Sequence, residues 1–344
     1  MIHQLLEKLY QQQNLSQAEC FEVFNQFFCG ETDPALISAV LVALKIKGET
    51  AQEIAGAAQA LAKNADFFDK PDYSTVDSCG TGGSGKHVIN ISTLVALLAA
   101  SAGIKITKHG NRSVSSQCGS ADVLEQLGVN INMDAGIARR CLDECGVTFL
   151  FAPNYHSGIR HVMPVRSALK TRTIFNRLGP LINPARPNIQ LMGVYASEHC
   201  LAAAETLKLS GCQSAMVVHS CGCDEITLAG KTQVAELRNG NISEYELSPE
   251  DFGLGRYPLE SLVGGNSETN AQHFIEVLQG KSTPAITETV AANAGALFYI
   301  SGHSDSIKSG VKEALSIIQS GKAIETLQKL VAVSQMNVKQ EMVL

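Results

Sequence analysis

Residues 77–86 read Asp-Ser-Cys-Gly-Thr-Gly-Gly-Ser-Gly-Lys, and they directly follow the strand-like residues Ser74–Val76. Glycines let the backbone turn tightly and bring its N–H groups against an anion. The run also fits the spacing of a nucleotide-binding P-loop, but the next residue is His87 rather than the Ser or Thr that binds magnesium there. We therefore expect an anion-binding loop at the end of a strand, and the alternative is a purely structural glycine turn.

Strands and helices alternate after this loop. Short apolar strands are expected at Ile104–Thr107, Val147–Phe151, Gln190–Val194 and Ala215–Val218. Helical segments are expected between them, at Ser92–Ala102, Ala121–Leu127, Ala135–Glu144 and Glu198–Leu209. Alternation of this kind predicts an α/β domain with a mostly parallel central sheet. The segment Val162–Asn183 interrupts the alternation as a helical insertion that carries many of the arginines.

The start of the chain shows helix-start signals instead. These are two capping boxes and an N-cap with a first-turn proline, at Ser16–Glu19, Thr50–Glu53 and Asp33–Pro34. We predict a small helical domain over residues 1–70 and a larger α/β domain over residues 71–344, with a linker at Asp69–Asp72.

Composition excludes several classes of protein. Of the 344 residues, 45% are apolar and 17% are charged, which is enough for a large core and unlike a disordered chain. The longest uncharged apolar stretch, Leu94–Ile104, is too short to span a membrane, and the first residues do not resemble a signal peptide. Ten cysteines without an export signal indicate reduced thiols in a cytoplasm. The net charge of −6 argues against nucleic-acid or membrane partners.

Acidic residues are missing from two long segments of this acidic chain. Neither Ser78–Ala121 nor Cys145–Ser197 contains an Asp or a Glu, although both contain lysine or arginine. An acidic side chain near a phosphate would repel it. The two segments therefore predict a shared anion site, and the alternative is chance combined with buried strands.

Three further motifs could carry chemistry. Asn90–Thr93 opens an apolar helix, whose N-terminus suits a phosphate; the alternative is a simple helix cap. Lys108–Ser116 brings cations and hydroxyls to the carboxyl end of a strand, where α/β sheets bind ligands; the alternative is a solvated basic turn. Asp224 and Glu225 follow another strand and suit magnesium, unless they form only an exposed acidic turn.

A zinc site is a weaker interpretation of the cysteines. Cys221 and Cys223 lie near His219, but a fourth ligand at a standard spacing is missing.

These motifs together resemble anthranilate phosphoribosyltransferases, in the family's order and over nearly the whole chain. The resemblance rests on Gly80–Gly83, Asn90–Thr93, Lys108–Ser116, Gly119–Leu124, Phe149–Pro153, His161–Arg166, Arg172–Asn176, Leu178–Pro184, Val217–His219, Asp224 and Glu225. Each motif alone is modest support, whereas the ordered set is highly specific.

The resemblance implies a nucleoside phosphorylase/phosphoribosyltransferase-like fold. The insertion 162–183 would join the helical domain, and the site would lie in the cleft between the two domains. Homodimers through the helical domain are usual in the family. The reaction it implies is transfer of 5-phosphoribose from 5-phosphoribosyl 1-diphosphate to the amine of anthranilate, in tryptophan biosynthesis.

The resemblance also implies a set of site residues. Those expected at 5-phosphoribosyl 1-diphosphate are Gly80, Gly83, Ser84, Val88, Asn90, Ile91, Ser92, Thr93, Lys108, His109, Gly110, Asn111, Arg112, Ser113, Val114, Ser115, Ser116 and Ser120. Those expected at anthranilate are Gly80, Asn111, His156, Arg166 and Gly179. Two Mg²⁺ per chain are expected, one at Ser92 and the other at Asp224 and Glu225. No side-chain acid or base is expected, because Arg166, Asn111 and Lys108 would act by positioning.

Two residues depart from the family pattern. Ser84 stands where the family usually has Asp, and Val88 where it usually has Ser or Thr. Loss of a carboxylate and of a hydroxyl beside the diphosphate predicts an active enzyme with altered magnesium dependence. Two alternatives stay open, namely a pyrimidine-nucleoside-phosphorylase-like enzyme and a non-catalytic relative that binds nucleic acid.

Overall fold

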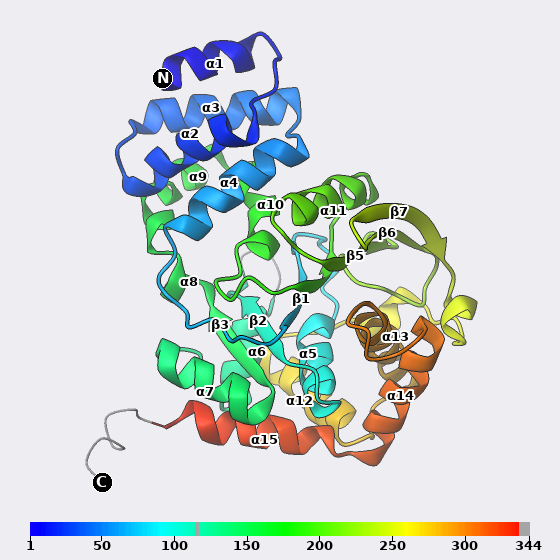
Figure 1. The fold of residues 1–344 in the computed structure, drawn as a ribbon. Helices are drawn as coiled ribbons and strands as arrows, with labels where there is room; N and C mark the ends of the chain where they lie inside the picture. Colours follow the sequence, from blue (N-terminus) through cyan, green and yellow to red (C-terminus); the bar gives the residue numbers. More distant parts are fainter. Residues whose placement is uncertain (114–116, 337–344) are drawn as a thin grey trace.

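The computed structural model describes residues 1–113 and 117–336, and a seven-stranded sheet forms the centre of the larger domain (Figure 1). The strands are β1 (Val76–Gly80), β2 (Ile106–Gly110), β3 (Val147–Phe151), β4 (Ile189–Gly193), β5 (Ser214–Ser220), β6 (Thr232–Arg238) and β7 (Asn241–Leu247). β1 to β5 are mutually parallel, whereas β6 and β7 add an antiparallel hairpin. The mostly parallel sheet is thereby confirmed, and the hairpin was not predicted.

The order of the strands defines where a ligand can bind. They lie in the order β3-β2-β1-β4-β5-β6-β7. From β1 the chain adds β2 and β3 on one side of the sheet, and it then crosses over to add β4 to β7 on the other side of β1. In open α/β sheets, a crevice forms outside the carboxyl ends of the strands where the order reverses. The crevice here lies at the ends of β1 and β4, and the glycine-rich loop begins there.

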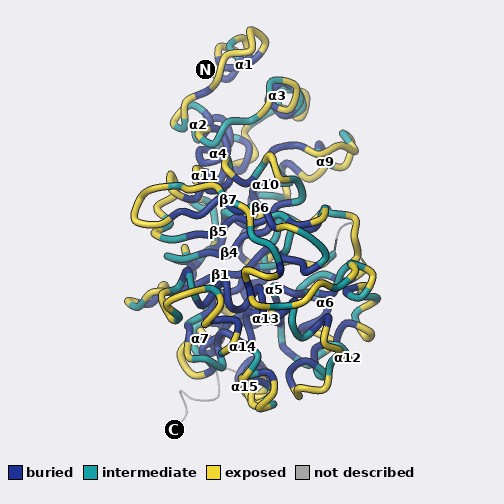
Figure 2. Tube along the Cα trace, turned by 90° about the vertical axis from the view of Figure 1, so that its right-hand side faces the viewer, coloured by how far each residue is buried: buried dark blue, intermediate teal, exposed yellow. Residues whose placement is uncertain are grey.

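The helices of the larger domain surround the five parallel strands, which are mostly buried, whereas β7 is largely exposed (Figure 2). They are α5 (Ile91–Ser101), α6 (Ser120–Gln126), α7 (Ala135–Cys145), α8 (Ala152–Tyr155), α11 (Cys200–Leu209), α12 (Ser267–Leu278), α13 (Pro284–Ile300), α14 (Ile307–Ser320) and α15 (Ala323–Ser334). α5 and α13 are apolar around most of their circumference because they lie in the core. Among the described residues, no helix is long and apolar enough to cross a membrane.

The first part of the chain folds as a separate group of helices. They are α1 (Ile2–Tyr10), α2 (Gln17–Cys29), α3 (Pro34–Lys47) and α4 (Ala51–Lys63). The predicted start signals are confirmed, because Ser16 and Thr50 form complete capping boxes and Asp33 caps α3 before Pro34. Lys47 also pairs with the buried carboxylate of Glu53 at 2.9 Å.

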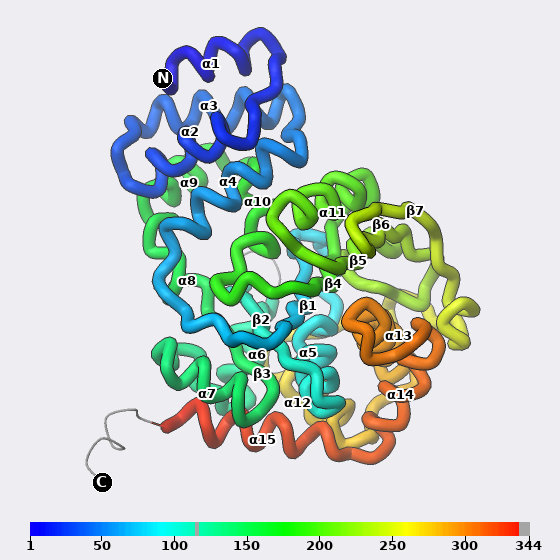
Figure 3. Tube along the Cα trace, viewed as in Figure 1, coloured from blue at the N-terminus to red at the C-terminus, as the bar shows by residue number. Residues whose placement is uncertain are grey.

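The insertion completes the core of these helices (Figures 1 and 3). It contains α9 (Met163–Leu169) and α10 (Phe175–Leu178), which pack beside helices made more than one hundred residues earlier. The ring of Phe175 lies 5.9 Å from that of Phe24 and 6.2 Å from that of Phe28. The helical core is therefore built from two separate parts of the chain, while the boundary at residue 70 stays a prediction.

Phe175→Ala should lower the free energy of unfolding by about 3–5 kcal/mol, because truncating a buried Phe leaves a cavity. Urea unfolding followed by circular dichroism measures the change. Phe67→Ala is the control, since its ring is 78% exposed, and it should cost less than about 0.5 kcal/mol. Equal losses in the two variants would contradict the role given to the insertion.

Candidate active site

Two glycines create the space for the acidic pair. Gly80 ends β1, Gly193 ends β4, and the two residues lie opposite each other in the sheet. A Cβ on Gly193 would lie 1.6 Å from the backbone oxygen of Asp224, and one on Gly80 would lie 2.4 Å from its Oδ2. Any side chain at either position would displace Asp224. The turn after β5 can therefore lie across the ends of β1 and β4 only because both residues are glycine.

The two carboxylates bind backbone groups from separate elements. Asp224 Oδ2 accepts a hydrogen bond from the Gly82 N–H at 2.7 Å, and Glu225 Oε1 accepts one from the Ser92 N–H at 3.2 Å. Burial, together with the charge of Asp224, raises the pKa of Glu225 above its ordinary range. Ser92, Asp224 and Glu225 carry the hydroxyl and carboxylate oxygens that magnesium prefers, so their chemistry fits the two predicted ions, one at Ser92 and the other at the two carboxylates.

The glycine-rich loop runs beside this pair. Gly82, Gly83 and Gly85 have φ angles of +68°, +77° and +70°, which residues with a Cβ rarely adopt. Arg172, from the insertion, donates a hydrogen bond to the Gly83 carbonyl at 2.5 Å and lies 4.3 Å from the ring centre of Tyr195. The loop is thereby attached to the segment that completes the helical domain.

Lys108 on β2 is a buried cation behind the loop. Its Nζ donates to the Ser78 carbonyl at 2.7 Å and to Ser92 Oγ at 3.2 Å. Burial lowers the pKa of Lys108, and the negative charge of Asp77 opposes this effect. Burial likewise raises the pKa of Asp77 to about 6, while Lys108 and a 2.9 Å hydrogen bond from Asn183 act against that rise. These groups hold the start of α5 beside β1 and β2.

The loop after β2 is organised by an acid that follows it. Asp122 Oδ2 accepts hydrogen bonds from the N–H groups of Ser113 and Gly119, at 3.0 and 2.9 Å. Arg112 forms ion pairs with Asp122 and Glu125, at 3.0 and 2.7 Å. Its guanidinium, predicted to bind phosphate, is thus already bound within the loop. Val114, Ser115 and Ser116 lie outside the described residues.

Asn111, Ser120, Gly110 and Asn90, in and around this loop, differ in whether their polar groups are exposed or already hydrogen-bonded within the protein. Asn111 is exposed, and its carbonyl accepts a hydrogen bond from Ser120 Oγ at 3.3 Å. A Cβ on Gly110 would lie 2.3 Å from the same Oγ, so Gly110 provides close packing. Asn90 donates from its side chain to the Cys118 carbonyl at 3.1 Å and does not cap α5. The Asn90 side chain therefore connects the start of α5 to the segment that precedes α6.

Some other predicted residues have side chains committed to the fold. Ile91 and Thr93 are buried, and the Val88 side chain packs against the core while its backbone bridges to Val263. Ser84 is only half-buried, in the glycine-rich loop. Of these residues, Ser84 alone presents a polar side chain that solvent can reach.

The residues predicted for the second substrate come from the insertion and from the end of β3. Arg166 is half-buried, stacks 5.0 Å from the ring centre of Phe175, and forms no ion pair with any described residue. His156 is buried edge-on to His109, with ring centres 5.2 Å apart. A Cβ on Gly179 would meet no atom within 4 Å. A half-buried guanidinium without a carboxylate partner is suited to a ligand that brings one.

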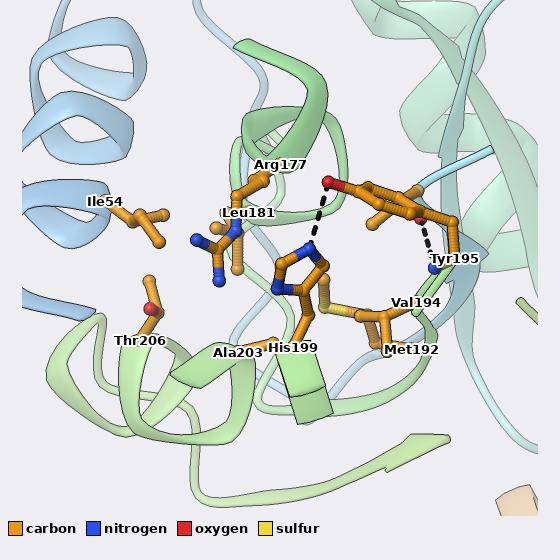
Figure 4. Close-up of a pocket in the computed structure, with 10 residues that line it drawn as sticks. Ile54, Arg177, Leu181, Met192, Val194, Tyr195, His199, Ala203 and Thr206 are labelled. Carbon is orange, nitrogen blue, oxygen red and sulfur yellow. Dashed lines mark hydrogen bonds between the residues drawn. The ribbon is translucent and has the colours of Figure 1, made fainter. Parts of the chain in front are cut away.

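A small pocket lies behind the glycine-rich loop, between the two domains (Figure 4). It is lined by Ile54, Thr81, Arg177, Leu181, Met192, Val194, Tyr195, His199, Ala203 and Thr206. Its volume of about 10 Å³ holds roughly one water molecule. Arg177 on its wall pairs with Glu49 of the helical domain at 3.5 Å. This pocket is too small for an aromatic substrate, and its ion pair connects the insertion to the N-terminal part of the same helical domain.

Sequence reasoning assigned no individual role to Gly193, Asp77, Asn183, Arg172 and Arg177, although Asp77, Asn183 and Arg172 lie within the motifs quoted above. A glycine at the end of a strand was the only available signal for Gly193, because its function depends on a partner about thirty residues away.

The zinc interpretation has no support: His219 Nδ1 lies 2.9 Å from the Val194 carbonyl, and the described residues contain no cluster of three metal-binding side chains.

Comparisons with known proteins agree with this geometry. Residues 3–65 match the helical bundle domain of the glycosyl transferase family, and residues 72–324 match the a/b domain of that family. Anthranilate phosphoribosyltransferase of Vibrio cholerae is 51% identical over 95% of this chain and 98% of its own length. The corresponding protein of Photobacterium profundum is 52% identical, covering 96% of this chain and 97% of its own.

Solved structures give the same result. The crystal structure of anthranilate phosphoribosyltransferase from Thermus thermophilus aligns with a TM-score of 0.92 at 40% identity, covering 96% of this chain and 99% of that one. The Saccharomyces cerevisiae enzyme in complex with PRPP and Mg aligns with a TM-score of 0.88 at 28% identity, covering 97% of both chains.

Gly193→Ala should destabilise the protein by about 2 kcal/mol or more, because the new methyl group must displace backbone atoms of Asp224. Urea unfolding measures the loss. Gly179→Ala is the matched control, since its Cβ has open space and its stability should stay within about 0.5 kcal/mol of the wild type. A Gly193→Ala protein as stable as the control would refute the packing constraint.

Stability should also fall on acidification through the two buried histidines. Burial lowers the pKa of His109 to about 3 and that of His156 to about 4. Unfolded histidines take up protons near pH 6.5, so the unfolded state binds more protons than the folded state as the pH falls from there toward 4. The free energy of unfolding of the wild type should therefore fall between pH 7 and pH 5, and His156→Leu should make that fall about 2 kcal/mol smaller.

Urea unfolding at both pH values checks this expectation. His3→Leu is the control, because His3 is exposed on α1, and it should keep the full wild-type loss. An unchanged loss in His156→Leu would rule out this contribution from His156.

Proposed function

This chain belongs to the anthranilate phosphoribosyltransferase family, and we propose that it transfers the 5-phosphoribosyl group of 5-phosphoribosyl 1-diphosphate to the amine of anthranilate, in tryptophan biosynthesis. The observation that carries the proposal is the position of Asp224 and Glu225. They hydrogen-bond to the glycine-rich loop and to the start of α5, at the crevice where the strand order reverses. A cation-binding pair next to a glycine-rich loop is suited to a diphosphate.

The diphosphate substrate would lie between the loop and α5. Gly80 and Gly83 would contribute backbone groups, and Ser92 and Lys108 would lie at the base of the site. We assign two Mg²⁺ to each chain, one at Ser92 and the other at Asp224 and Glu225. Bound magnesium would supply positive charge that stabilises the departing diphosphate.

Anthranilate would bind nearer the insertion. Arg166 would pair with its carboxylate, and Asn111, His156 and Gly179 would line its pocket. The stacking of Arg166 on Phe175 fixes the direction of the guanidinium, which favours a planar carboxylate in one orientation. The aromatic amine is already a nucleophile, so placing it against the anomeric carbon suffices and a strong base is not required.

The two alternative functions are less well supported. The relatives are named as transferases rather than nucleoside phosphorylases, and the unpaired Arg166 suits a carboxylate better than a pyrimidine. A nucleic-acid-binding role conflicts with the net charge of −6.

The proposal also includes an oligomeric state and a cellular location. We assign a homodimer through the helical domain, supported by a groove between α1 and α3 with exposed Tyr10 and Ile46 at its rim. A cytoplasmic location is supported by ten free cysteines, all within the described residues.

The test of function follows anthranilate fluorescence in the presence of 5-phosphoribosyl 1-diphosphate and magnesium. Fluorescence should fall only when both substrates and the metal are present. A folded protein that leaves it unchanged at every magnesium concentration would refute the proposal. Phosphorolysis of thymidine or uridine in the same preparation would favour the phosphorylase instead.

Arg166→Ala should raise the KM for anthranilate by about 10- to 100-fold, because a charge-assisted pair with the substrate carboxylate is lost. The KM for 5-phosphoribosyl 1-diphosphate should change much less. Arg160→Ala removes an exposed arginine nearby and serves as the control. Equal increases in both KM values would count against this role of Arg166.

A further inference from the structure

The last residue of the glycine-rich loop, Lys86, places a cation at the turn that carries the acidic pair. Lys86 is exposed, and its Cε and Nζ lie 3.0 and 3.9 Å from the position that a Cβ on Gly222 would take. Gly222 lies two residues before Asp224, on the turn that carries both carboxylates. The loop after β1 and the turn after β5 therefore meet at this lysine.

No described residue neutralises Lys86. Its Nζ makes no ion pair or hydrogen bond within the described part of the chain, and Asp224 and Glu225 instead accept the backbone hydrogen bonds of Gly82 and Ser92.

The rest of the loop contains no negative charge to balance this lysine. Asp77 is buried beneath it, bonded to Asn183 and facing Lys108. From there to His87 the loop has no acid, and Ser84 contributes only a hydroxyl. A carboxylate in the loop would attract a metal ion to the diphosphate, whereas a lysine supplies the positive charge itself.

We propose that Lys86 binds the diphosphate group of the substrate directly, and that this chain therefore binds inorganic diphosphate without magnesium. The inference rests on the function proposed above and names a further ligand within that site. An ammonium group is an effective point-charge partner for phosphate oxygens, and a flexible side chain that follows a run of glycines can reach them. Ser84 allows this arrangement, because an Asp there would compete for the ammonium group.

The experiment measures the Kd of inorganic diphosphate by isothermal titration calorimetry in EDTA. Lys86→Met should weaken binding by about tenfold or more, the usual value of a hydrogen bond to a charged group. Lys86→Arg should stay within about threefold of the wild type, since it keeps the charge. Lys281→Met, which removes an exposed lysine whose ammonium group bonds only to Gln279, should bind as the wild type does.

Ser84→Asp provides an independent arm. It should weaken diphosphate binding in EDTA, because the new carboxylate repels the ligand and pairs with Lys86, and added magnesium should restore the affinity. A wild-type protein that binds no diphosphate in EDTA, or equal affinities of wild type and Lys86→Met, would overturn the inference. So would a magnesium titration of Ser84→Asp that matches that of the wild type.

These outcomes are separable from the proposed function, because diphosphate binding needs no anthranilate. A protein that binds diphosphate through Lys86 but leaves anthranilate fluorescent would refute the proposed reaction alone. Turnover of anthranilate with unaltered diphosphate binding by Lys86→Met would refute the role of Lys86 alone. Unfolding midpoints of all variants, expected within about 2 °C of one another for exposed positions, exclude a folding defect.

Discussion

The arrangement of the site depends on the absence of two side chains. Gly80 and Gly193 end neighbouring strands, and Asp224 occupies the space that their methyl groups would need, with its side chain at Gly80 and its backbone at Gly193. Because Asp224 lies there, it can accept the Gly82 N–H and orient the glycine-rich loop. Glu225 then reaches the start of α5. The missing side chains at Gly80 and Gly193 therefore determine where the carboxylates of Asp224 and Glu225 lie.

Beneath the glycine-rich loop lies a buried pair of opposite charges. Lys108 and Asp77 lie under the loop, with Asn183 bonded to Asp77 and to the Thr107 carbonyl. Burial disfavours the charged form of each ionisable group, and each stabilises the charge of the other. Asn183 ends the insertion, so the same network connects the strand ends to the segment that carries Arg166 and Arg172.

The sequence predicted those parts that depend on local patterns. Strands β2 to β5 and the helix caps at Ser16, Asp33 and Thr50 follow from short-range periodicity and capping chemistry. β1 was placed too early, at Ser74–Val76, because the glycines of the run 77–86 suggested a loop, whereas the strand spans Val76–Gly80 and the loop begins after it. The hairpin β6–β7 was missed because β7 is a largely exposed edge strand without an apolar run. Gly193, Arg172 and the ion pairs of Arg112 were not identified because they depend on strand register and on contacts between distant segments. The acid-free segments predicted an anion site but could not show that Arg112 is bound by acids just beyond them.

The helical core has a consequence for how the chain matures during synthesis. Phe24 and Phe28 meet Phe175 only after the ribosome has made the insertion, which follows the first three strands of the sheet. Until then, α2 and α4 can pack against each other, but the faces of α2 that Phe24 and Phe28 present to Phe175 stay uncovered. The N-terminal helices therefore emerge first but finish folding late, and their completion is tied to that of the sheet. A cell making this protein has to keep those faces from aggregating while more than one hundred further residues are translated.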